Sequence, residues 1–202
     1  GVGNGRERDH GLFPELSRMF GLTAPVPCLN NEPYYDGLKW GNTADQGSDL
    51  AAYYSRVALY GSVLSGGLAG HVYGAHHTWS GDPEMPDAFL VQSAPQMQHI
   101  REFLLAGGKA YQDLVPDRGL LDPSQTPNED GRKGWAYCMR TETWDLFLLY
   151  FEMDCPRPNL TGATPGGAYE VQWFDTVTGA WAATEPVEAD ASGCISIPEF
   201  PC

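Results

Sequence analysis

A strand, a helix and a second strand follow one another between residues 25 and 73, and this order constrains the fold more than any other feature. The apolar run 25–29 predicts the first strand, the broad apolar face of 50–64 predicts the helix, and residues 68–73 resume as a strand. Such a crossover normally sets its two strands side by side and parallel. We therefore expect the first half of the chain to be α/β.

Helix signals flank this unit on both sides. An apolar stripe predicts a helix over 12–20. The capping-box pairs Thr43 with Gln46 and Ser93 with Gln96 predict the starts of the central helix and of a later one. The α/β region is expected to end shortly after that later helix, so that residues 1–113 form the first domain.

The second half, residues 114–202, predicts a different architecture, because its strands are short and are separated by Pro, Gly and Asp. The strands are expected at 135–139, 144–151, 169–174, 180–183 and 194–197, with a hairpin loop at 175–179. Strands at this spacing favour a β-sandwich. We expect four tryptophans to fill its core or the seam between the domains: Trp135, Trp144, Trp173 and Trp181.

Charge excludes several classes of partner. The chain of 202 residues has 26 acidic and 12 basic side chains and a formal net charge of −14. This charge repels phosphate backbones and anionic lipid surfaces, so we expect no nucleic-acid partner and no membrane partner. No stretch reaches the about 20 apolar residues that span a bilayer.

The five cysteines lie at positions 28, 138, 155, 194 and 202. They form no CxxC pair and no spacing with histidine that suits zinc, so we expect neither a metal nor a cofactor. Disulfides are the expected use, with Cys28 as a buried free thiol because it lies in an apolar run. Together with the glycosylation sequon at 159–161, this favours a secreted, extracellular protein.

The first polar cluster follows the first predicted strand. Glu32 is the candidate catalytic carboxylate, because a carboxylate just beyond a parallel strand can reach a ligand there, attack an anomeric carbon or activate water. Asn30 and Asn31 are candidates to bind sugar hydroxyls, and Tyr34 or Tyr35 to orient Glu32. The alternative interpretation is an ordinary loop with a solvated carboxylate.

The second polar cluster follows the second predicted strand and contains His71, Tyr73, His76, His77 and Trp79. Its aromatic faces suit stacking on a sugar ring, and its imidazoles suit hydrogen bonds to hydroxyls. We take His71, Tyr73 and Trp79 as substrate-binding candidates. Packing is the default role of the adjacent histidines, which lack a helical HxxxH partner, and Trp79 is equally interpretable as a lid.

Three motifs together resemble the apiosidase-like glycoside hydrolases: NNEPYYDG at 30–37, YGSVLSGGLAGHVYG at 60–74 with Trp79, and PQMQHIREFL at 95–104. Residues 135–201, above all EVQWFDTVTGAW at 170–181, resemble the β domain that follows the barrel in that family and is named for collagen binding. The order of these motifs matches as well.

The resemblance implies a (β/α)8 TIM barrel in which the glutamate matching Glu32 follows the seventh strand as nucleophile. It implies action on polysaccharide side chains, with apiose release as the family's named example. The general acid comes from an earlier strand in that family. A TIM barrel needs about 250 residues, so only its last two or three strands fit here. We expect a missing N-terminal barrel portion or another chain to complete it.

Two functions are open at this point. The first is a retaining glycosidase whose substrate is a polysaccharide or oligosaccharide. The second is a non-catalytic carbohydrate- or matrix-binding subunit of an extracellular assembly, motivated by the lack of a paired general acid. The first requires that Glu32 and the cluster at 71–79 share one end of neighbouring parallel strands.

Overall fold

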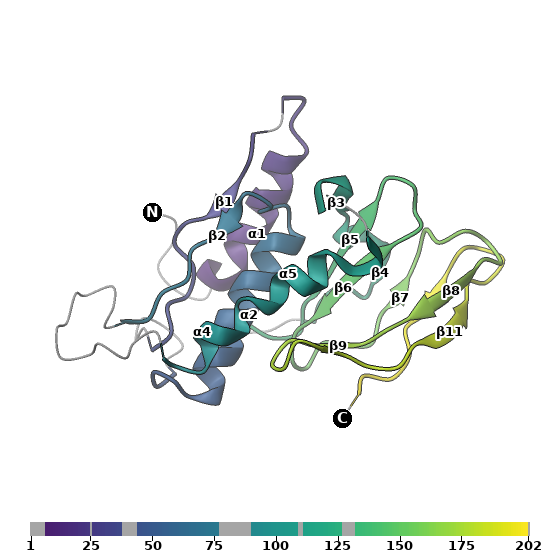
Figure 1. Cartoon of the computed structure of the whole chain (residues 1–202). Helices are drawn as coiled ribbons and strands as arrows, with labels where there is room; N and C mark the ends of the chain where they lie inside the picture. The colour runs from purple at the N-terminus through teal and green to yellow at the C-terminus, as the bar shows by residue number, and fades with distance from the viewer. Residues whose placement is uncertain are drawn as a thin grey trace.

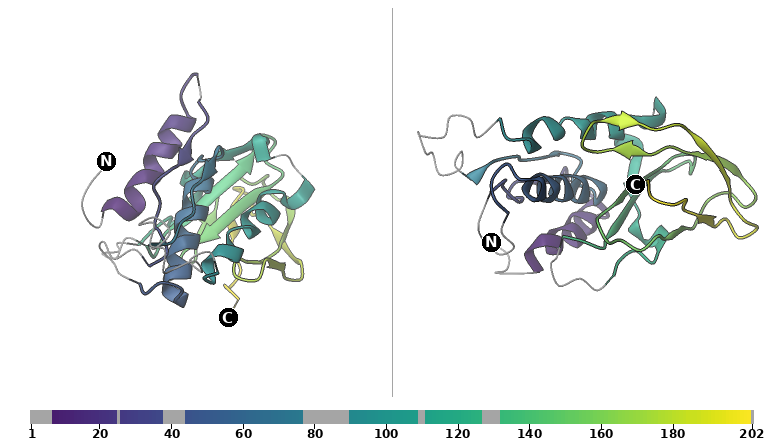
Figure 2. Two further views of the ribbon diagram at one scale, coloured as in Figure 1. Left: turned by 60° about the vertical axis from the view of Figure 1, so that its left-hand side comes forward. Right: turned by 90° about the horizontal axis from the view of Figure 1, so that it is seen from below.

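The computed structural model describes residues 7–24, 26–37, 44–76, 90–108, 111–126 and 132–201. Helices gather in one part of the molecule and the strands of the second half in another, as views from three directions agree (Figures 1 and 2). The helical segments are α1 (Glu7–Phe20), α2 (Asp49–Leu64), α4 (Ser93–Gln96), α5 (His99–Leu104), and the 3-10 turns η2 (Ala106–Gly108), η3 (Tyr111–Asp113) and η4 (Arg118–Leu120). None of the described helices is both long enough and apolar enough to cross a bilayer.

Helix α2 is the centre of the first half. It begins at Asp49, and its cap is Ser48, whose Oγ accepts a hydrogen bond of 3.1 Å from the N–H of Ala51. The capping box predicted from Thr43 and Gln46 is therefore wrong in position, because Ser48, directly before the helix, is the cap. Thr43 itself lies outside the described residues. The ring of Phe13 from α1 packs directly over Gly61, where an added Cβ would lie 2.7 Å from it.

Strands β1 (Leu29–Asn30) and β2 (Gly70–His71) flank α2 in sequence and pair in parallel. Leu29 is opposite Gly70, and Asn30 is opposite His71. The predicted parallel crossover is confirmed, but both strands are shorter than expected. The two segments diverge after these pairs and meet again only at a parallel bridge between Asp36 and Ala75, so the ladder is interrupted.

The second half is formed by short antiparallel strands. They are β3 (Leu114–Pro116), β4 (Leu121–Asp122), β5 (Ala136–Thr141), β6 (Phe147–Phe151), β7 (Asn159–Leu160), β8 (Ala168–Val171), β9 (Phe174–Asp175), β10 (Ala180–Trp181), β11 (Glu185–Glu188) and β12 (Ile195–Ser196). They form sheets in the orders β3-β5-β6 and β12-β7-β4, and the pairs β8-β11 and β9-β10. The mixed α/β class is confirmed, whereas the partial barrel and the β-sandwich stay predictions.

The strand predictions differ in detail from the structure, and four short strands, β3, β4, β7 and β11, were not predicted. The strand expected from 144 begins at Phe147, because Trp144 has φ 58° in the turn that precedes β6. The strand expected over 169–174 is divided into β8 and β9. Strand β11 was missed because its sequence, EPVE, has one apolar side chain among exposed ones. The hairpin loop at 175–179 is confirmed between β9 and β10.

Strand β5 separates the two larger cores of the molecule. Successive side chains of a strand point to opposite faces. Tyr137 and Met139 therefore enter one core, and Ala136 and Cys138 enter the other. The first core also contains Phe13, Leu16, Leu59, Tyr60, Val63, Leu64, Phe103, Leu114, Leu148 and Tyr150. It joins helices of the first half to strands of the second, while the boundary at residue 113 stays a prediction.

The four tryptophans are all half-buried. Trp135 and Trp181 face the helical part: Trp135 stacks on His10 of α1 at 3.9 Å between ring centroids, and Trp181 stacks on Phe103 of α5 at 6.2 Å. Trp173 instead packs edge-on against Phe200 in the strand-rich part. Trp135 and Trp181 thus contact the helical part, whereas Trp173 packs within the strand-rich part.

The expected disulfides are not found among the described cysteines. Cys28, Cys138, Cys155 and Cys194 are free thiols, and Cys202 lies outside the described residues. Cys138 and Cys155 belong to the second core, and burial raises the pKa of the Cys155 thiol to about 12. Cys28, expected to be buried, is only half-buried, and its Sγ donates to the carbonyl of Val26.

Candidate functional site

The residues that directly follow the two parallel strands form the candidate site. We call the surface made by residues 31–36 and 72–76 the mouth. Because β1 and β2 run in the same direction and are in register, both segments leave the pair at the same end. The last pair, Asn30 with His71, includes a hydrogen bond of 3.0 Å from the N–H of Val72 to the carbonyl of Asn30. The structure thus brings the described residues of the two predicted polar clusters to one edge.

Asn31 and Glu32 are exposed at the mouth, whereas Asn30 is buried beneath it. The Nδ2 of Asn30 donates to Ser62 Oγ of α2 at 2.8 Å. Its Oδ1 accepts from the backbone N–H of Glu32 at 3.3 Å. Asn30 therefore ties the start of the loop to the helix behind it and holds the backbone of Glu32, and its predicted sugar contact stays a prediction.

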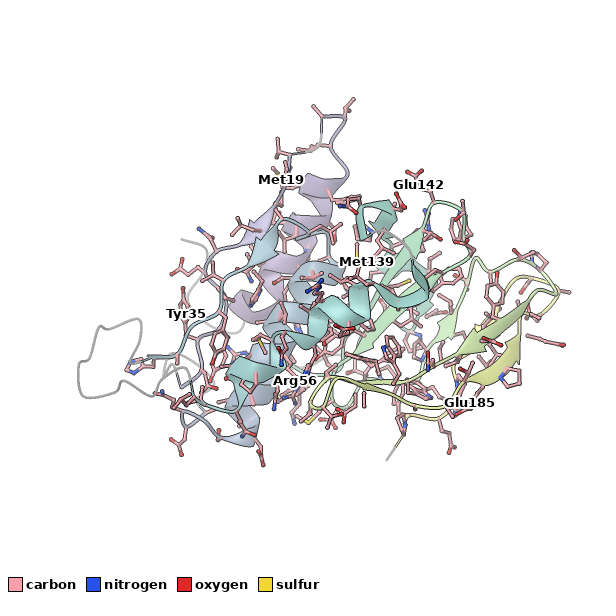
Figure 3. The ribbon with its side chains drawn as sticks, in the orientation of Figure 1. Met19, Tyr35, Arg56, Met139, Glu142 and Glu185 are labelled. Carbon is pink, nitrogen blue, oxygen red and sulfur yellow. The ribbon has the colours of Figure 1, made fainter. Side chains whose placement is uncertain are left out.

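Tyr35 joins the two segments of the mouth by packing against Gly74. A Cβ at Gly74 would lie 2.5 Å from the Tyr35 ring, so glycine is required for this contact. Figure 3 shows Tyr35 beside the helices, on the far side of the molecule from Glu185 of β11. Of the two candidate orienting tyrosines, Tyr35 is the one in direct contact with the other segment.

Tyr34 points elsewhere. Its ring packs edge-on against Tyr54 of α2 at 5.5 Å, and the guanidinium of Arg132 lies 4.7 Å from its centroid. Its hydroxyl oxygen accepts from the N–H of Gly37 at 3.2 Å. Burial raises the pKa of Tyr34 to about 12. These contacts make Tyr34 part of a third core around α2 rather than an exposed group of the mouth.

His71 is held as a neutral imidazole at the end of β2. Burial lowers its pKa to about 4, and its Nδ1 is buried without a hydrogen-bond partner. A neutral imidazole offers one donor and one acceptor. His71 can therefore hydrogen-bond a hydroxyl without carrying charge, which suits the predicted contact with a sugar.

Tyr73 lies beyond His71, and its hydroxyl is 2.8 Å from Ser93 Oγ of α4. Burial is the main reason that the pKa of Tyr73 is raised. Ser93 also donates to Asp36, a fully buried carboxylate in the first segment of the mouth. Sequence patterns alone give no role to Asp36 and predict Ser93 only as part of a helix cap, although α4 has no side-chain cap.

The remaining predicted residues are only partly described. The backbone N–H of His76 donates to the carbonyl of Asp36 at 2.8 Å. His77 and Trp79 lie outside the described residues. Within the described ranges no three His, Cys, Asp or Glu side chains are grouped as a metal would require.

A second polar cluster lies at the junction of α1 with β5 and β6, and we call it the junction cluster. Glu152 is 3% exposed, and its Oε1 lies 2.8 Å from His10 Nε2 and accepts a 2.8 Å hydrogen bond from Tyr137 Oη. Its Oε2 accepts from the N–H of Trp135 at 3.2 Å. The guanidinium of Arg118 covers the Trp135 ring at 3.9 Å. Every oxygen of this carboxylate is used within the protein.

Comparison with known proteins agrees with this fold. Residues 11–108 match the family model described as "Apiosidase-like, catalytic domain". No curated protein sequence matches the chain. One similar solved structure is described as a glycoside hydrolase, with a TM-score of 0.68 and 16% identity over 94% of this chain and 45% of that one.

Another similar structure is a glycoside hydrolase family 5 protein from Bacteroides vulgatus ATCC 8482, with a TM-score of 0.69 and 14% identity. It covers 96% of this chain and 42% of its own. At such identities the likeness is one of fold, and this chain spans less than half the length of both structures. The resemblance to the β domain named for collagen binding stays a prediction. The resemblance of this chain to the apiosidase-like glycoside hydrolases is confirmed over residues 11–108.

Proposed function

We propose that this chain is the C-terminal portion of a retaining glycoside hydrolase that removes side-chain sugars, such as apiose, from polysaccharides. In this proposal Glu32 is the nucleophile and the mouth is the sugar subsite. Asn31, Tyr35, His71, Tyr73 and Trp79 shape that subsite, with Asn30 behind them.

The observation that carries the proposal is the register of β1 with β2. It sets Asn30 opposite His71, so the exposed Glu32 and the half-buried Tyr73 each follow by two residues at the same end of the pair. Ligand sites of parallel α/β folds lie at that end of the strands. A carboxylate there, beside an aromatic ring and a neutral imidazole, suits a sugar better than an anion.

The chemistry asked of Glu32 is an attack on the anomeric carbon. Its carboxylate forms the glycosyl ester while a general acid protonates the departing oxygen, and water then hydrolyses the ester. The general acid is proposed to come from an earlier barrel strand, in an N-terminal portion or another chain. Its support is that this chain spans less than half of the similar glycoside hydrolase structures. Secretion and an extracellular substrate complete the proposal.

The test is hydrolysis of an aryl apioside by the complete protein and by its Glu32→Gln variant. The amide keeps the size of the side chain but cannot form the ester, so kcat is expected to fall at least about a thousand-fold. Glu142→Gln is the matched control, because Glu142 is an exposed glutamate in the turn between β5 and β6 (Figure 3).

Equal loss in both variants, or full activity in Glu32→Gln, contradicts the proposed role of Glu32. Binding of apiose-bearing polysaccharide without any turnover by the unsubstituted complete protein supports the non-catalytic binding subunit instead.

A further inference from the structure

A chain of hydrogen bonds links the two segments of the mouth through α4. Tyr73 Oη lies 2.8 Å from Ser93 Oγ, and the Ser93 hydroxyl donates to Asp36 Oδ2. The other oxygen, Asp36 Oδ1, accepts from the N–H of Gly47 at 2.8 Å. Asp36 and Ser93 are both 0% exposed, so bulk water does not compete for these bonds.

The carboxylate sets the direction of the whole chain. Ser93 Oγ donates to one oxygen of Asp36 and the N–H of Gly47 donates to the other, so both oxygens of Asp36 accept. The single hydrogen of the Ser93 hydroxyl is used on Asp36, and Ser93 Oγ must then accept from Tyr73. The hydrogen of Tyr73 is thereby committed to the interior, and the phenolic oxygen keeps its remaining lone pair for a ligand.

We propose that Asp36 is a positioning residue that acts through Ser93 and fixes Tyr73 as a hydrogen-bond acceptor toward the sugar. The inference rests on the proposed function, because Tyr73 contacts a sugar only if the mouth is the subsite. It adds a specificity. A ligand group facing Tyr73 must be a donor, so a free sugar hydroxyl is selected over a carboxylate or an ether oxygen at that position.

Asp36→Asn is a sharp test, because it keeps size and the acceptor for Gly47 while placing an NH2 group toward Ser93. The NH2 donates to Ser93, whose own hydrogen then turns to Tyr73. The backbone bonds of Asp36, from its N–H to Gly74 and from His76 to its carbonyl, do not involve the side chain. The substitution therefore reverses the direction of these hydrogen bonds without removing the link between the two segments of the mouth.

The first readout is the ionisation of Tyr73, followed by the near-ultraviolet absorbance of tyrosinate. The charge of Asp36 raises the pKa of Tyr73. In Asp36→Asn that charge is lost and the Ser93 hydrogen turns to the phenolic oxygen, where it stabilises tyrosinate. The ionisation of one tyrosine should therefore move to lower pH, and this shift should be absent in a Tyr73→Phe background.

The control for lost charge is Asp49→Asn, an exposed aspartate of α2 that accepts a bond from Gln92 and should leave Tyr73 unchanged. A merely loosened structure would hydrate Tyr73 and lower its ionisation pH whether or not Ser93 is present. If Asp36 acts through Ser93, the shift caused by Asp36→Asn should be smaller in a Ser93→Ala background. An equal shift in that background, or a shift that persists in Tyr73→Phe, overturns the inference.

The second readout is turnover of an aryl apioside by the complete protein. Reversing one hydrogen bond to the sugar corresponds to about a ten-fold loss in kcat/KM for Asp36→Asn, and none for Asp49→Asn. Wild-type kcat/KM in Asp36→Asn overturns the inference. If the ionisation of Tyr73 shifts as expected but Glu32→Gln stays fully active, the proposed function fails, whereas the inferred direction of the hydrogen bonds from Tyr73 to Asp36 stands. If Glu32→Gln is inactive but the shifts are absent, this inference alone fails.

Discussion

The mouth and the junction cluster both contain a glutamate, but their surroundings are opposite. Glu32 is exposed at the end of a two-residue strand, beside the equally exposed Asn31. Glu152 is buried, accepts from Tyr137 and Trp135, and lies against His10. A search for buried carboxylates with polar neighbours would select Glu152 first.

Burial with polar neighbours does not by itself mark a carboxylate for chemistry in this chain. The acceptors of Glu152 are satisfied within the protein, so it has little capacity left for a ligand, and its partners come from α1 and the β5–β6 sheet. The hydrogen bonds of Glu152 therefore stabilise the fold. Glu32 is an exposed residue at the edge where the residues that follow β1 and β2 come together, and this position is the basis of its proposed catalytic role.

The largest expected effect on stability comes from Glu152→Ala. Removing this carboxylate leaves His10 and Tyr137 as buried polar groups without their partner, which should lower the free energy of unfolding by about 3–5 kcal/mol. Urea unfolding followed by circular dichroism measures it. Glu142→Ala, at an exposed glutamate, should change stability by less than about 0.5 kcal/mol. Similar losses in both variants would end the contrast between the two regions.

A second effect comes from His71 and depends on pH. Its pKa is lowered from 6.5 to about 4 in the folded state, so the unfolded chain binds more protons between these values. Protonation of His71 therefore does not reduce the free energy of unfolding above pH 6.5. As the pH falls from 6.5 toward 4, the free energy of unfolding decreases by up to about 3 kcal/mol.

Urea unfolding near neutrality and near pH 4.5 measures this loss, with His71→Asn as the comparison. The asparagine variant should lose less stability on acidification than the parent protein. An identical loss in both would show that His71 is not held as a neutral group, and would weaken its proposed contact with the sugar.

The smallest effect on stability is expected from Gly74→Ala. The new methyl group would lie 2.5 Å from the Tyr35 ring, so one segment of the mouth must shift, at a cost of about 1–3 kcal/mol. Turnover by the complete protein should fall by more than this stability loss explains. Gly11→Ala is the control, because nothing lies within 4 Å of an added Cβ there. Unchanged turnover in Gly74→Ala would separate Tyr35 from the site.

Sequence periodicity was sufficient for the order of strand, helix and strand and for the α1 helix, because apolar spacing alone carries that information. It overestimated β1 and β2, since an apolar run does not show where the hydrogen bonds to a neighbour end. Ser48 was missed as the cap because two hydroxyl residues precede α2.

Local sequence patterns could not predict the contacts that define the mouth and the junction cluster. Ser93 and Asp36 are 57 positions apart, and His10 and Glu152 are 142 apart. Ser93 fits the pattern of a helix cap because a serine hydroxyl often bonds to nearby backbone groups. In the structure the Ser93 hydroxyl donates instead to Asp36, which is distant in sequence. The mouth itself was predicted because parallel pairing brings successive strand ends together.

The proposed role of Glu32 as the nucleophile at the mouth can be tested by covalent trapping of the complete protein with an activated fluoroglycoside, followed by peptide mapping by mass spectrometry. One sugar is expected on the peptide that contains Glu32, and none in Glu32→Gln. A label on another carboxylate, or a protein that turns over the substrate with Glu32 unlabelled, would contradict it.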